Sequence, residues 1–218
     1  MPPLKDQKEI VVGVVVFENA MTLDFVGPVS YLELLRKLGV HVAIHTISFG
    51  QRPLSFPGRM PLYASTSFAD APSSLDILVV PGGSGRLNVL QDRGFLEYIK
   101  KVASTAQFVL SVCTGSSILA AIGLLDGRNA TTNKIAFDTI ASEYPRVRWQ
   151  RRARWVVDGK FWTGSGVAAG LDMAHAFVSE QYGPKAANAM ARYMEIVPNT
   201  DPNDDPFENS GSKPLEFQ

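Results

Sequence analysis

Cys113 is the only cysteine among the 218 residues of the chain, and its place in the sequence is typical of a nucleophile. It follows the apolar residues 107–112 and precedes Thr114 and Gly115, which predicts a sharp step from a buried strand into a helix. Such a step presents a side chain at the end of a sheet, and small neighbours relieve the crowding. We expect Gly115 to permit the positive φ angle of the turn. The helix N-terminus that follows would lower the thiol pKa and stabilise a thiolate.

A structural role for Cys113 is the alternative that the sequence leaves open. A free cysteine is among the most often buried residue types and then behaves as a small hydrophobic side chain. The sequence therefore favours a nucleophile at this position without excluding an inert thiol.

Two glycines follow a second apolar run, in the segment VVPGGSG of residues 79–85. The backbone N–H groups of Gly82 and Gly83 can face the same space as the thiol and hold a developing negative charge. A plain turn that ends the strand is the alternative. The segment lacks the Gly-x-Gly-x-x-Gly spacing of a dinucleotide site, and the chain has no Walker sequence.

Asp24 lies between Leu23 and Phe25, shortly after the first apolar run and just before a predicted helix. One interpretation is an N-terminal helix cap. The other is a proton relay that faces Cys113, because a carboxyl group removed from water has a raised pKa and can act as acid or base.

The elements that must position these residues are alternating strands and helices. Apolar or alternating runs predict strands over residues 10–17, 40–49, 75–83 and 107–113, and a pair of strands over 146–150 and 154–166 with Asp158-Gly159 at its turn. Helical spacing predicts helices over residues 29–39, 94–106, 115–125, 134–144, 167–183 and 184–197, with Pro28 in the first turn of the first of them. A short hairpin is expected within 51–74 and a short strand within 127–132.

This alternation predicts an α/β fold, a flavodoxin-like sandwich with a mostly parallel sheet and helices on both faces. In such sheets, ligands bind beyond the carboxyl ends of the strands. Asp24, the Gly82-Gly83 turn and Cys113 each follow a predicted strand end, so we expect them to line one pocket.

Composition and charge exclude several classes of protein. Hydrophobic residues make up 45% of the chain and charged residues 19%, which is enough for a sizeable core. Basic and acidic residues both number 21, and this balance disfavours a nucleic-acid binder. The local basic cluster of residues 148–155 is interpreted as a solvated strand or hairpin face, with an anion site as the alternative. One cysteine excludes an intrachain disulfide, and three scattered histidines make a metal site improbable.

The ends of the chain differ from its middle. Residues 1–9 are polar and Pro-rich, with no signal-like apolar segment, and no apolar run is long enough to span a membrane. We therefore expect a cytoplasmic protein with a short N-terminal tail (1–9), one domain (10–197) and a C-terminal extension (198–218). The extension is rich in Pro, Asp and Asn, which predicts an extended or disordered segment that lies on a partner subunit.

Four segments of the chain resemble the PfpI/DJ-1 superfamily of class I glutamine amidotransferase-like proteins. They are FENAMTLDFVGP (17–28), LDILVVPGG (75–83), SVCTGSSILAAIGLLDGRNATTN (111–133) and GVAAGLDMA (166–174). The resemblance extends from about residue 10 to residue 195. Because Cys-Thr-Gly occurs together with an aspartate in the first loop, the sequence is most similar to the isonitrile hydratase-like members.

The resemblance implies a flavodoxin-like fold, a homodimer and a small-molecule substrate, with no metal or organic cofactor. It also implies that Cys113 is the nucleophile and Asp24 the acid and base, with the N–H groups of Gly83 and Thr114 forming an oxyanion-type site. The implied reaction is addition of the thiolate to an isocyanide carbon, protonation by Asp24, and attack of water on the thioimidate to release an N-formamide.

The sequence departs from other superfamily members at three positions. Thr114 replaces the histidine that follows the cysteine in many proteases and chaperone-like members, and Asp24 replaces a longer glutamate. Asn133 stands where some hydratase-like relatives have a histidine. His175, spaced to lie on a helix face, is interpreted as a core or interface residue, so a Cys-His triad is not supported.

Two other functions use the same thiol. One is a tailoring enzyme of secondary metabolism, whose larger substrate would be shaped by residues 52–63, 148–162 and the C-terminal extension. The other is a non-catalytic, redox-sensing or stress protein, in which Cys113 would oxidise to a sulfenic or sulfinic acid. A fused helix-turn-helix regulator receives little support, because the chain ends after the extension.

Overall fold

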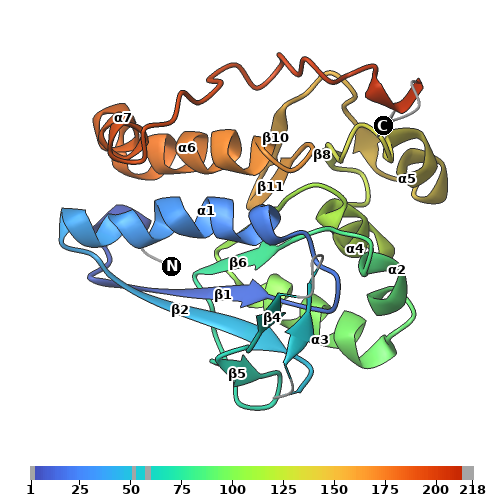
Figure 1. Cartoon of the computed structure of the whole chain (residues 1–218), viewed down its shortest axis with the longest axis horizontal. Coiled ribbons are helices and arrows are strands. Elements are labelled where there is room, and N and C mark those ends of the chain that lie inside the picture. Colours follow the sequence, from blue (N-terminus) through green and yellow to red (C-terminus); the bar gives the residue numbers. More distant parts are fainter. Residues whose placement is uncertain (1–2, 51–52, 57–59, 213–218) are drawn as a thin grey trace.

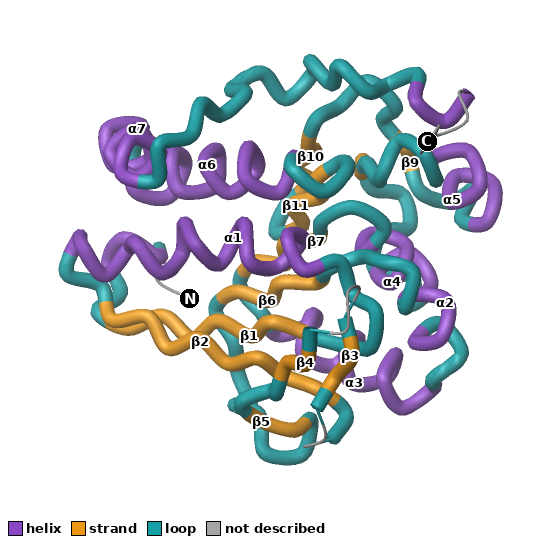
Figure 2. The backbone as a smooth tube through the Cα atoms, viewed as in Figure 1, coloured by secondary structure: helices purple, strands orange, loops and turns teal. Residues whose placement is uncertain are grey.

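A seven-stranded sheet forms the centre of the computed structural model, which describes residues 3–50, 53–56 and 60–212. In spatial order its strands are β10 (Trp155–Asp158), β11 (Phe161–Gly164), β7 (Phe108–Ser111), β6 (Ile77–Val80), β1 (Glu9–Val15), β2 (His41–Ser48) and β5 (Thr66–Ser67). Neighbouring strands are parallel except β10 and β11, which form an antiparallel hairpin at one edge (Figure 2). The predicted mostly parallel α/β fold is confirmed.

Helices cover both faces of this sheet. They are α1 (Thr22–Leu34), α2 (Arg86–Val89), α3 (Arg93–Thr105), α4 (Gly115–Ala121), α5 (Phe137–Glu143), α6 (Ala169–Tyr182) and α7 (Pro184–Tyr193), with the 3-10 turns η1 (Leu4–Asp6), η2 (Leu35–Leu38) and η4 (Ser210–Ser212). In Figure 1, α1 and α6 lie side by side over one face, with α7 against α6. The strand order runs from β1 toward β2 first and from β1 toward β6 and β7 afterwards. Because parallel strands are usually joined by right-handed crossovers, α3, which joins β6 to β7, lies on the opposite face from α1.

The strands form where apolar side chains can be buried on both faces. All four residues of β6 are buried, and the register aligns Val80 of β6 with Ser111 of β7. The carboxyl ends of β6 and β7 therefore lie next to each other. The strand order reverses between β1 and β6, and open α/β sheets bind ligands at such a switch point. Asp24 follows β1, the Gly82-Gly83 turn follows β6, and Cys113 follows the neighbouring strand β7.

The α1 helix begins earlier than the sequence predicts. It includes Asp24 in its first turn and carries Pro28 as its seventh residue, whereas the prediction placed Pro28 in the first turn. A proline inside a helix removes one hydrogen bond, but packing against α6 favours the longer helix here. Gly27 packs against Leu171, and Pro28 packs against Gly170. At the other end, η2 stops at Gly39, whose φ of 82° is left-handed, so the predicted helix end is confirmed.

The predicted strand pair near the edge is correct only in part. The hairpin of β10 and β11 turns at Asp158-Gly159 as predicted. Residues of the preceding predicted strand instead form β9 (Arg148–Trp149), which pairs in parallel with β8 (Asn129–Ala130). A further small hairpin joins β3 (Leu54–Ser55) to β4 (Pro61–Leu62), within the predicted region.

Three arginines of the basic cluster of residues 148–155 pair with carboxylates. Arg154 is buried and pairs with Asp172 at 2.8 Å. Arg151 pairs with Asp138, and Arg152 lies 3.2 Å from Glu208. The expectation of a solvated face is therefore wrong for Arg154, because its guanidinium meets a buried carboxylate.

The first and the last described segments of the chain, residues 3–9 and 198–212, pack on the domain itself. In the predicted N-terminal tail, η1 contacts α6 and the side chain of Leu4 is fully buried. At the other end, residues 198–212 are irregular but are held against the same chain. Of the two expected states, extended or disordered, the disordered one is therefore wrong over this range, and the contact with a partner subunit stays a prediction. The backbone N–H of Arg154 donates to the carbonyl of Pro202 at 2.7 Å, and Asp205 is buried. Residues 213–218 of the predicted extension lie outside the described residues.

Within the part of the chain that the structure describes, no helix has the length and apolar character required to cross a membrane.

Candidate active site

Cys113 lies on a strained turn between β7 and α4. Its φ angle is +57°, a left-handed conformation that non-glycine residues seldom adopt and that is found at functional sites. Its N–H donates to the carbonyls of Ser165 at 2.8 Å and Gly164 at 3.2 Å, and its carbonyl accepts from Thr132 Oγ1 at 3.1 Å. These bonds hold the strained backbone in place and fix the direction of the thiol.

Gly115 serves this turn differently from the prediction. The positive φ falls on Cys113 itself, and Gly115 is required because the start of α4 packs closely on the end of β6. A Cβ atom at Gly115 would lie 2.3 Å from the carbonyl oxygen of Val80, a separation that real Cβ atoms do not show.

Replacing Gly115 by alanine is therefore expected to lower the free energy of unfolding by about 2 kcal/mol or more, the usual cost of overpacking. The matched control is Gly94→Ala in the first turn of α3, where a new Cβ would meet the ring of the exposed Phe49 at 3.3 Å and Asp92 Oδ1 at 3.4 Å, and no backbone atom. Urea denaturation of both variants checks this prediction. Equal stability of the two variants would contradict the close packing at Gly115.

Asp24 is held beside the thiol from the first turn of α1. Its side chain is fully buried, and its Oδ2 accepts a hydrogen bond from the N–H of Gly82 at 2.9 Å. The Cys113 thiol is a second hydrogen-bond partner of this carboxyl group. Oδ1 is buried and has no hydrogen-bond partner among the described residues. The helix begins with Met21 as its N-cap, so the alternative of Asp24 as the cap is wrong.

Burial raises the pKa of Asp24 to about 7, although the hydrogen bonds from Gly82 and Cys113 oppose this rise. A carboxyl group with such a pKa is present in both protonation states near neutral pH. It is therefore suited to accept a proton in one step and to return it in another.

Burial, together with the nearby Asp24 carboxylate, raises the pKa of the Cys113 thiol to about 12. The expectation of a thiolate stabilised by the helix N-terminus is therefore wrong for the resting site, because desolvation outweighs the donors around the sulfur. The side chain is 6% exposed. The resting thiol therefore keeps its proton.

Three donors nevertheless surround the sulfur and favour its ionised form. They are the backbone N–H of Thr114, the side-chain amide of Asn133 and the backbone N–H of Val167. The Asn133 amide is oriented because its Oδ1 accepts from the N–H of Ile135 at 2.9 Å. These donors stabilise negative charge on sulfur once the proton has left.

The two glycines of the turn after β6 lie at the site, but their N–H groups already have partners. Gly82 donates to Asp24, and Gly83 donates to Thr114 Oγ1 at 3.1 Å. A Cβ atom on Gly82 would lie 2.5 Å from the N atom of Thr114, so only glycine allows this approach. The hydrogen bonds of Gly82 and Gly83 thus connect the turn after β6 to Asp24 on α1 and to Thr114, which follows Cys113.

Asn133 and Val167 are the site residues that the sequence reasoning did not place. Asn133 was noted only as a departure from relatives, and Val167 contributes only its backbone, which leaves no side-chain pattern. The glycine at position 166 is the one sequence feature related to Asn133, because a Cβ atom at Gly166 would lie 3.1 Å from Asn133 Nδ2. Gly166, the first residue of the GVAAGLDMA segment, thus leaves room for the amide.

His175 lies away from this chemistry, within the helical layer. It is buried on α6, its Nε2 lies 3.1 Å from Asn188 Oδ1, and its ring packs edge-to-face on Tyr31. The interpretation of His175 as a core residue is confirmed.

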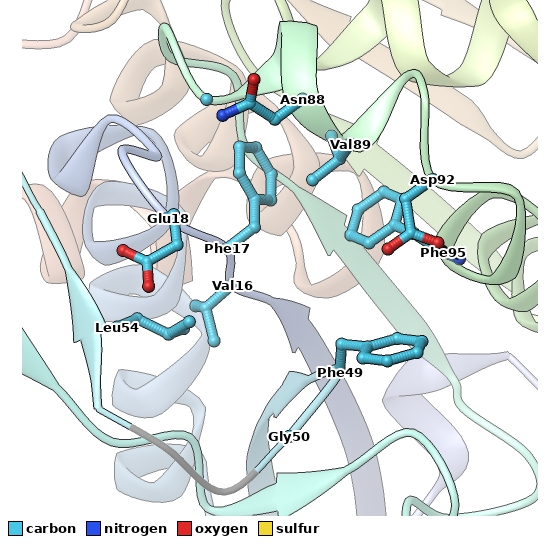
Figure 3. A pocket seen from close by; sticks show the side chains of 11 residues that line it. Val16, Phe17, Glu18, Phe49, Gly50, Leu54, Asn88, Val89, Asp92 and Phe95 are labelled. Atoms are coloured by element: carbon cyan, nitrogen blue, oxygen red, sulfur yellow. Dashed lines mark hydrogen bonds between the residues drawn. The ribbon is translucent and has the colours of Figure 1, made fainter.

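A cavity of about 490 Å³ lies beside the site, at the end of β1. Figure 3 shows Glu18 and Asp92 on opposite sides of this cavity, with Phe17 and Phe95 between them. The bond from Gly85 N–H to the carbonyl of Asn19 ties its wall to the loop that leads to Asp24. The cavity contains neither Cys113 nor Asp24 among its lining residues.

We expected residues 52–63 to shape a wide pocket. Of these residues, Leu54 lines the cavity, whereas residues 52 and 57–59 lie outside the described residues.

Comparison with known proteins agrees with this geometry. The chain is 33% identical over 189 residues to the isonitrile hydratase of Pseudomonas putida, which covers 86% of this chain and 78% of the relative. It is 24% identical over 182 residues to the HTH-type transcriptional regulator GbdR of Pseudomonas aeruginosa, with 83% of this chain but 49% of the regulator covered.

The chain is also similar in fold to a solved structure. The ThiJ/PfpI family protein from Pseudomonas syringae superposes with a TM-score of 0.80 at 27% identity, over 88% of this chain and 77% of that protein. The profile of the DJ-1/PfpI family matches residues 11–180, a range that includes the strand ends and both Asp24 and Cys113. The chain therefore belongs to the DJ-1/PfpI family.

Proposed function

We propose that this protein is a cysteine-dependent hydratase that adds water to an isocyanide and releases an N-substituted formamide. The observation that carries the proposal is the buried pair of Cys113 and Asp24, in which the thiol is a hydrogen-bond partner of a carboxyl group whose pKa is about 7. The similarity to the isonitrile hydratase of Pseudomonas putida supports the substrate class.

In the first step, the Asp24 carboxylate accepts the proton of the Cys113 thiol as sulfur forms a bond to the terminal carbon of the isocyanide. Asp24 then delivers this proton to the same carbon. The product is a thioimidate, Cys113–S–CH=N–R, which contains every atom of the thiol and the isocyanide. Because the thiol pKa is about 12, removal of its proton by a neighbouring base is needed for the attack.

In the second step, water adds to the thioimidate carbon. Asp24 accepts a proton from the water and passes it to the nitrogen, which gives the tetrahedral intermediate Cys113–S–CH(OH)–NH–R. The intermediate then expels the sulfur, its hydroxyl proton passes through Asp24 to the sulfur, and the N-formamide leaves. The donors from Thr114, Asn133 and Val167 stabilise the departing thiolate.

The proposal predicts how the rate depends on pH. Since the first step requires Asp24 as a carboxylate, kcat/KM for an isocyanide should rise with pH through about 7, the pKa of this group. Formamide release from aliphatic and aromatic isocyanides, followed by proton NMR between pH 5 and pH 9, checks this prediction. A rate that is independent of pH over this range would contradict the role of Asp24.

The same assay separates the alternatives. A tailoring enzyme with a larger substrate would leave small isocyanides unchanged. A redox-sensing role receives less support from this site, because oxidation follows thiolate character and exposure, whereas the thiol is 6% exposed and its pKa is raised. The homodimer and the absence of nucleic-acid partners stay predictions of the sequence.

A further inference from the structure

The C-terminal segment of residues 198–212 crosses the molecule and returns to the side that holds the thiol. It leaves α7, passes along α6 and reaches α5, as the red trace in Figure 1 shows. The N–H of Asn199 donates to Asp172 Oδ1 at 2.9 Å, and the carbonyl of Pro202 accepts from the N–H of Arg154. This segment lies beyond residue 180, where the match to the family ends.

Asp205 is the residue through which the segment enters the interior. Its side chain is fully buried, with Oδ2 3.6 Å from Lys134 Nζ and Oδ1 3.5 Å from Arg154 Nη1. Both cationic side chains are buried, and Arg154 also pairs with Asp172. Two cations and two carboxylates thus form a balanced cluster, here called the tail cluster: Lys134, Arg154, Asp172 and Asp205.

Lys134 connects the tail cluster to one donor of the sulfur. Its Nζ donates to Thr131 Oγ1 and to the carbonyl of Ala153, each at 2.7 Å. These bonds fix residues 131–134, the segment that carries Asn133. Burial lowers the pKa of Lys134 to about 8, and Asp205 opposes this change. Asp205 therefore helps to keep charged the side chain that anchors the segment next to the thiol.

Arg154 connects the tail cluster to another donor. Its carbonyl accepts from the N–H of Ser165 at 2.9 Å, and the carbonyl of Ser165 accepts from the N–H of Cys113 at 2.8 Å. Val167, whose N–H donates to the sulfur, follows two residues later. Asn133 is thus adjacent to Lys134, and Val167 is two residues from Ser165, which is bonded to Arg154. Two of the three donors to the sulfur therefore lie close to the tail cluster along the chain.

We propose that Asp205 is a positioning residue for Cys113, which holds the Asn133 and Val167 donors against the sulfur through Lys134 and Arg154. It does not touch the reacting atoms. The C-terminal segment then completes the active site rather than only covering it. The effect on turnover rests on the proposed hydratase function, whereas the effect on the thiol environment does not.

The test compares Asp205→Asn with Asp76→Asn in the full chain. Asp76 is a matched control because its Oδ2 accepts the N–H of Val11 at 2.8 Å, at the opposite end of the sheet. Labelling the cysteine β-carbon with ¹³C gives one NMR resonance, since the chain has one cysteine. We expect this resonance to shift or broaden in D205N and to keep its wild-type position in D76N. Turnover should fall in kcat by about tenfold or more in D205N, with KM changed little.

Two further variants keep the test decisive. Asp205→Glu retains the charge and should restore the wild-type resonance. If D205N does not unfold cooperatively, the double variant D205N/K134M restores the charge balance of the tail cluster, and its resonance should be displaced from that of K134M, the reference for the loss of Lys134 itself.

An unchanged resonance in folded D205N, or in the double variant, would overturn the proposal and leave Asp205 a purely structural role. If no isocyanide is turned over by the wild-type protein, the hydratase function fails, but the comparison of resonances still decides the role of Asp205.

Discussion

Replacing Cys113 by alanine is expected to reduce isocyanide hydration by at least about 10⁴-fold, as removal of a covalent nucleophile does in other enzymes. Without the sulfur no thioimidate forms, and Asp24 alone cannot bring water to the isocyanide carbon. The chain should still fold, because the thiol contributes little apolar area and the turn is fixed by backbone bonds to Gly164 and Ser165. Formamide production by equal amounts of wild-type and C113A protein checks this prediction.

The strained backbone offers a control for this variant. Glycine adopts a φ of +57° readily, whereas alanine does not. We therefore expect C113G to be more stable than C113A by about 1 kcal/mol in urea denaturation, with both variants inactive. Formamide production by folded C113A at the wild-type rate would contradict covalent catalysis by this residue.

Replacing Asp24 by asparagine is expected to have opposite effects on activity and stability. Hydration should fall by about 10²- to 10⁴-fold, since the acid and base of both steps is lost. Asparagine has nearly the same shape, and its side-chain oxygen can still accept the N–H of Gly82. Stability should nevertheless rise at pH 8, because the variant no longer buries a carboxylate.

The direction of this stability change follows from the pKa of Asp24, which rises from 3.8 to about 7 on folding. Between these values the folded chain binds more protons than the unfolded chain, so stability falls as pH rises. The accumulated loss above pH 7 is on the order of 4 kcal/mol, at about 1.4 kcal/mol per pH unit.

Urea denaturation of wild type and D24N at pH 4 and pH 8 measures this effect. The two proteins should have similar free energies of unfolding at pH 4, and D24N should be more stable than wild type at pH 8. Asp76→Asn serves as the control at the other end of the sheet and should show no such gain. A D24N variant that is less stable than wild type at pH 8 would show that the carboxylate is well accommodated in the fold.

Much of the fold follows from local patterns. The apolar runs that became β1, β6 and β7 are buried because parallel strands are covered on both faces. The spacing of Phe95, Ile99 and Val102 gives α3 one apolar face. Because parallel strands end at the same edge, this topology also places Asp24 and Gly82 in contact near Cys113, whereas the cavity at the end of β1 is lined by other residues than the predicted ones.

Other features depend on contacts between distant segments, which local patterns do not contain. The early start of α1 depends on packing against α6, which outweighs the hydrogen bond that Pro28 removes. The donor from Val167 is a backbone group, and any residue type provides it. Asp205 lies in a segment whose composition resembles a solvated tail, and its buried cationic partners, which are distant in the sequence, help to hold it on the domain.

The ionisation of the thiol also could not be deduced from the sequence. A helix N-terminus next to Cys113 favours a thiolate, but burial and the Asp24 carboxylate favour the thiol more strongly. The balance depends on how completely the turn is covered by residues 131–133 and 165–167, which lie near it only in the folded chain.

The most direct test of this account is an infrared titration of the Asp24 carboxyl group, taken as the difference between wild type and D24N. We predict a protonated-carboxyl band that is half lost at about pH 7, because burial raises the pKa of this group. If the band has already disappeared at pH 5, Asp24 is an ordinary carboxylate, and the proposed proton transfer between Cys113 and Asp24 is wrong.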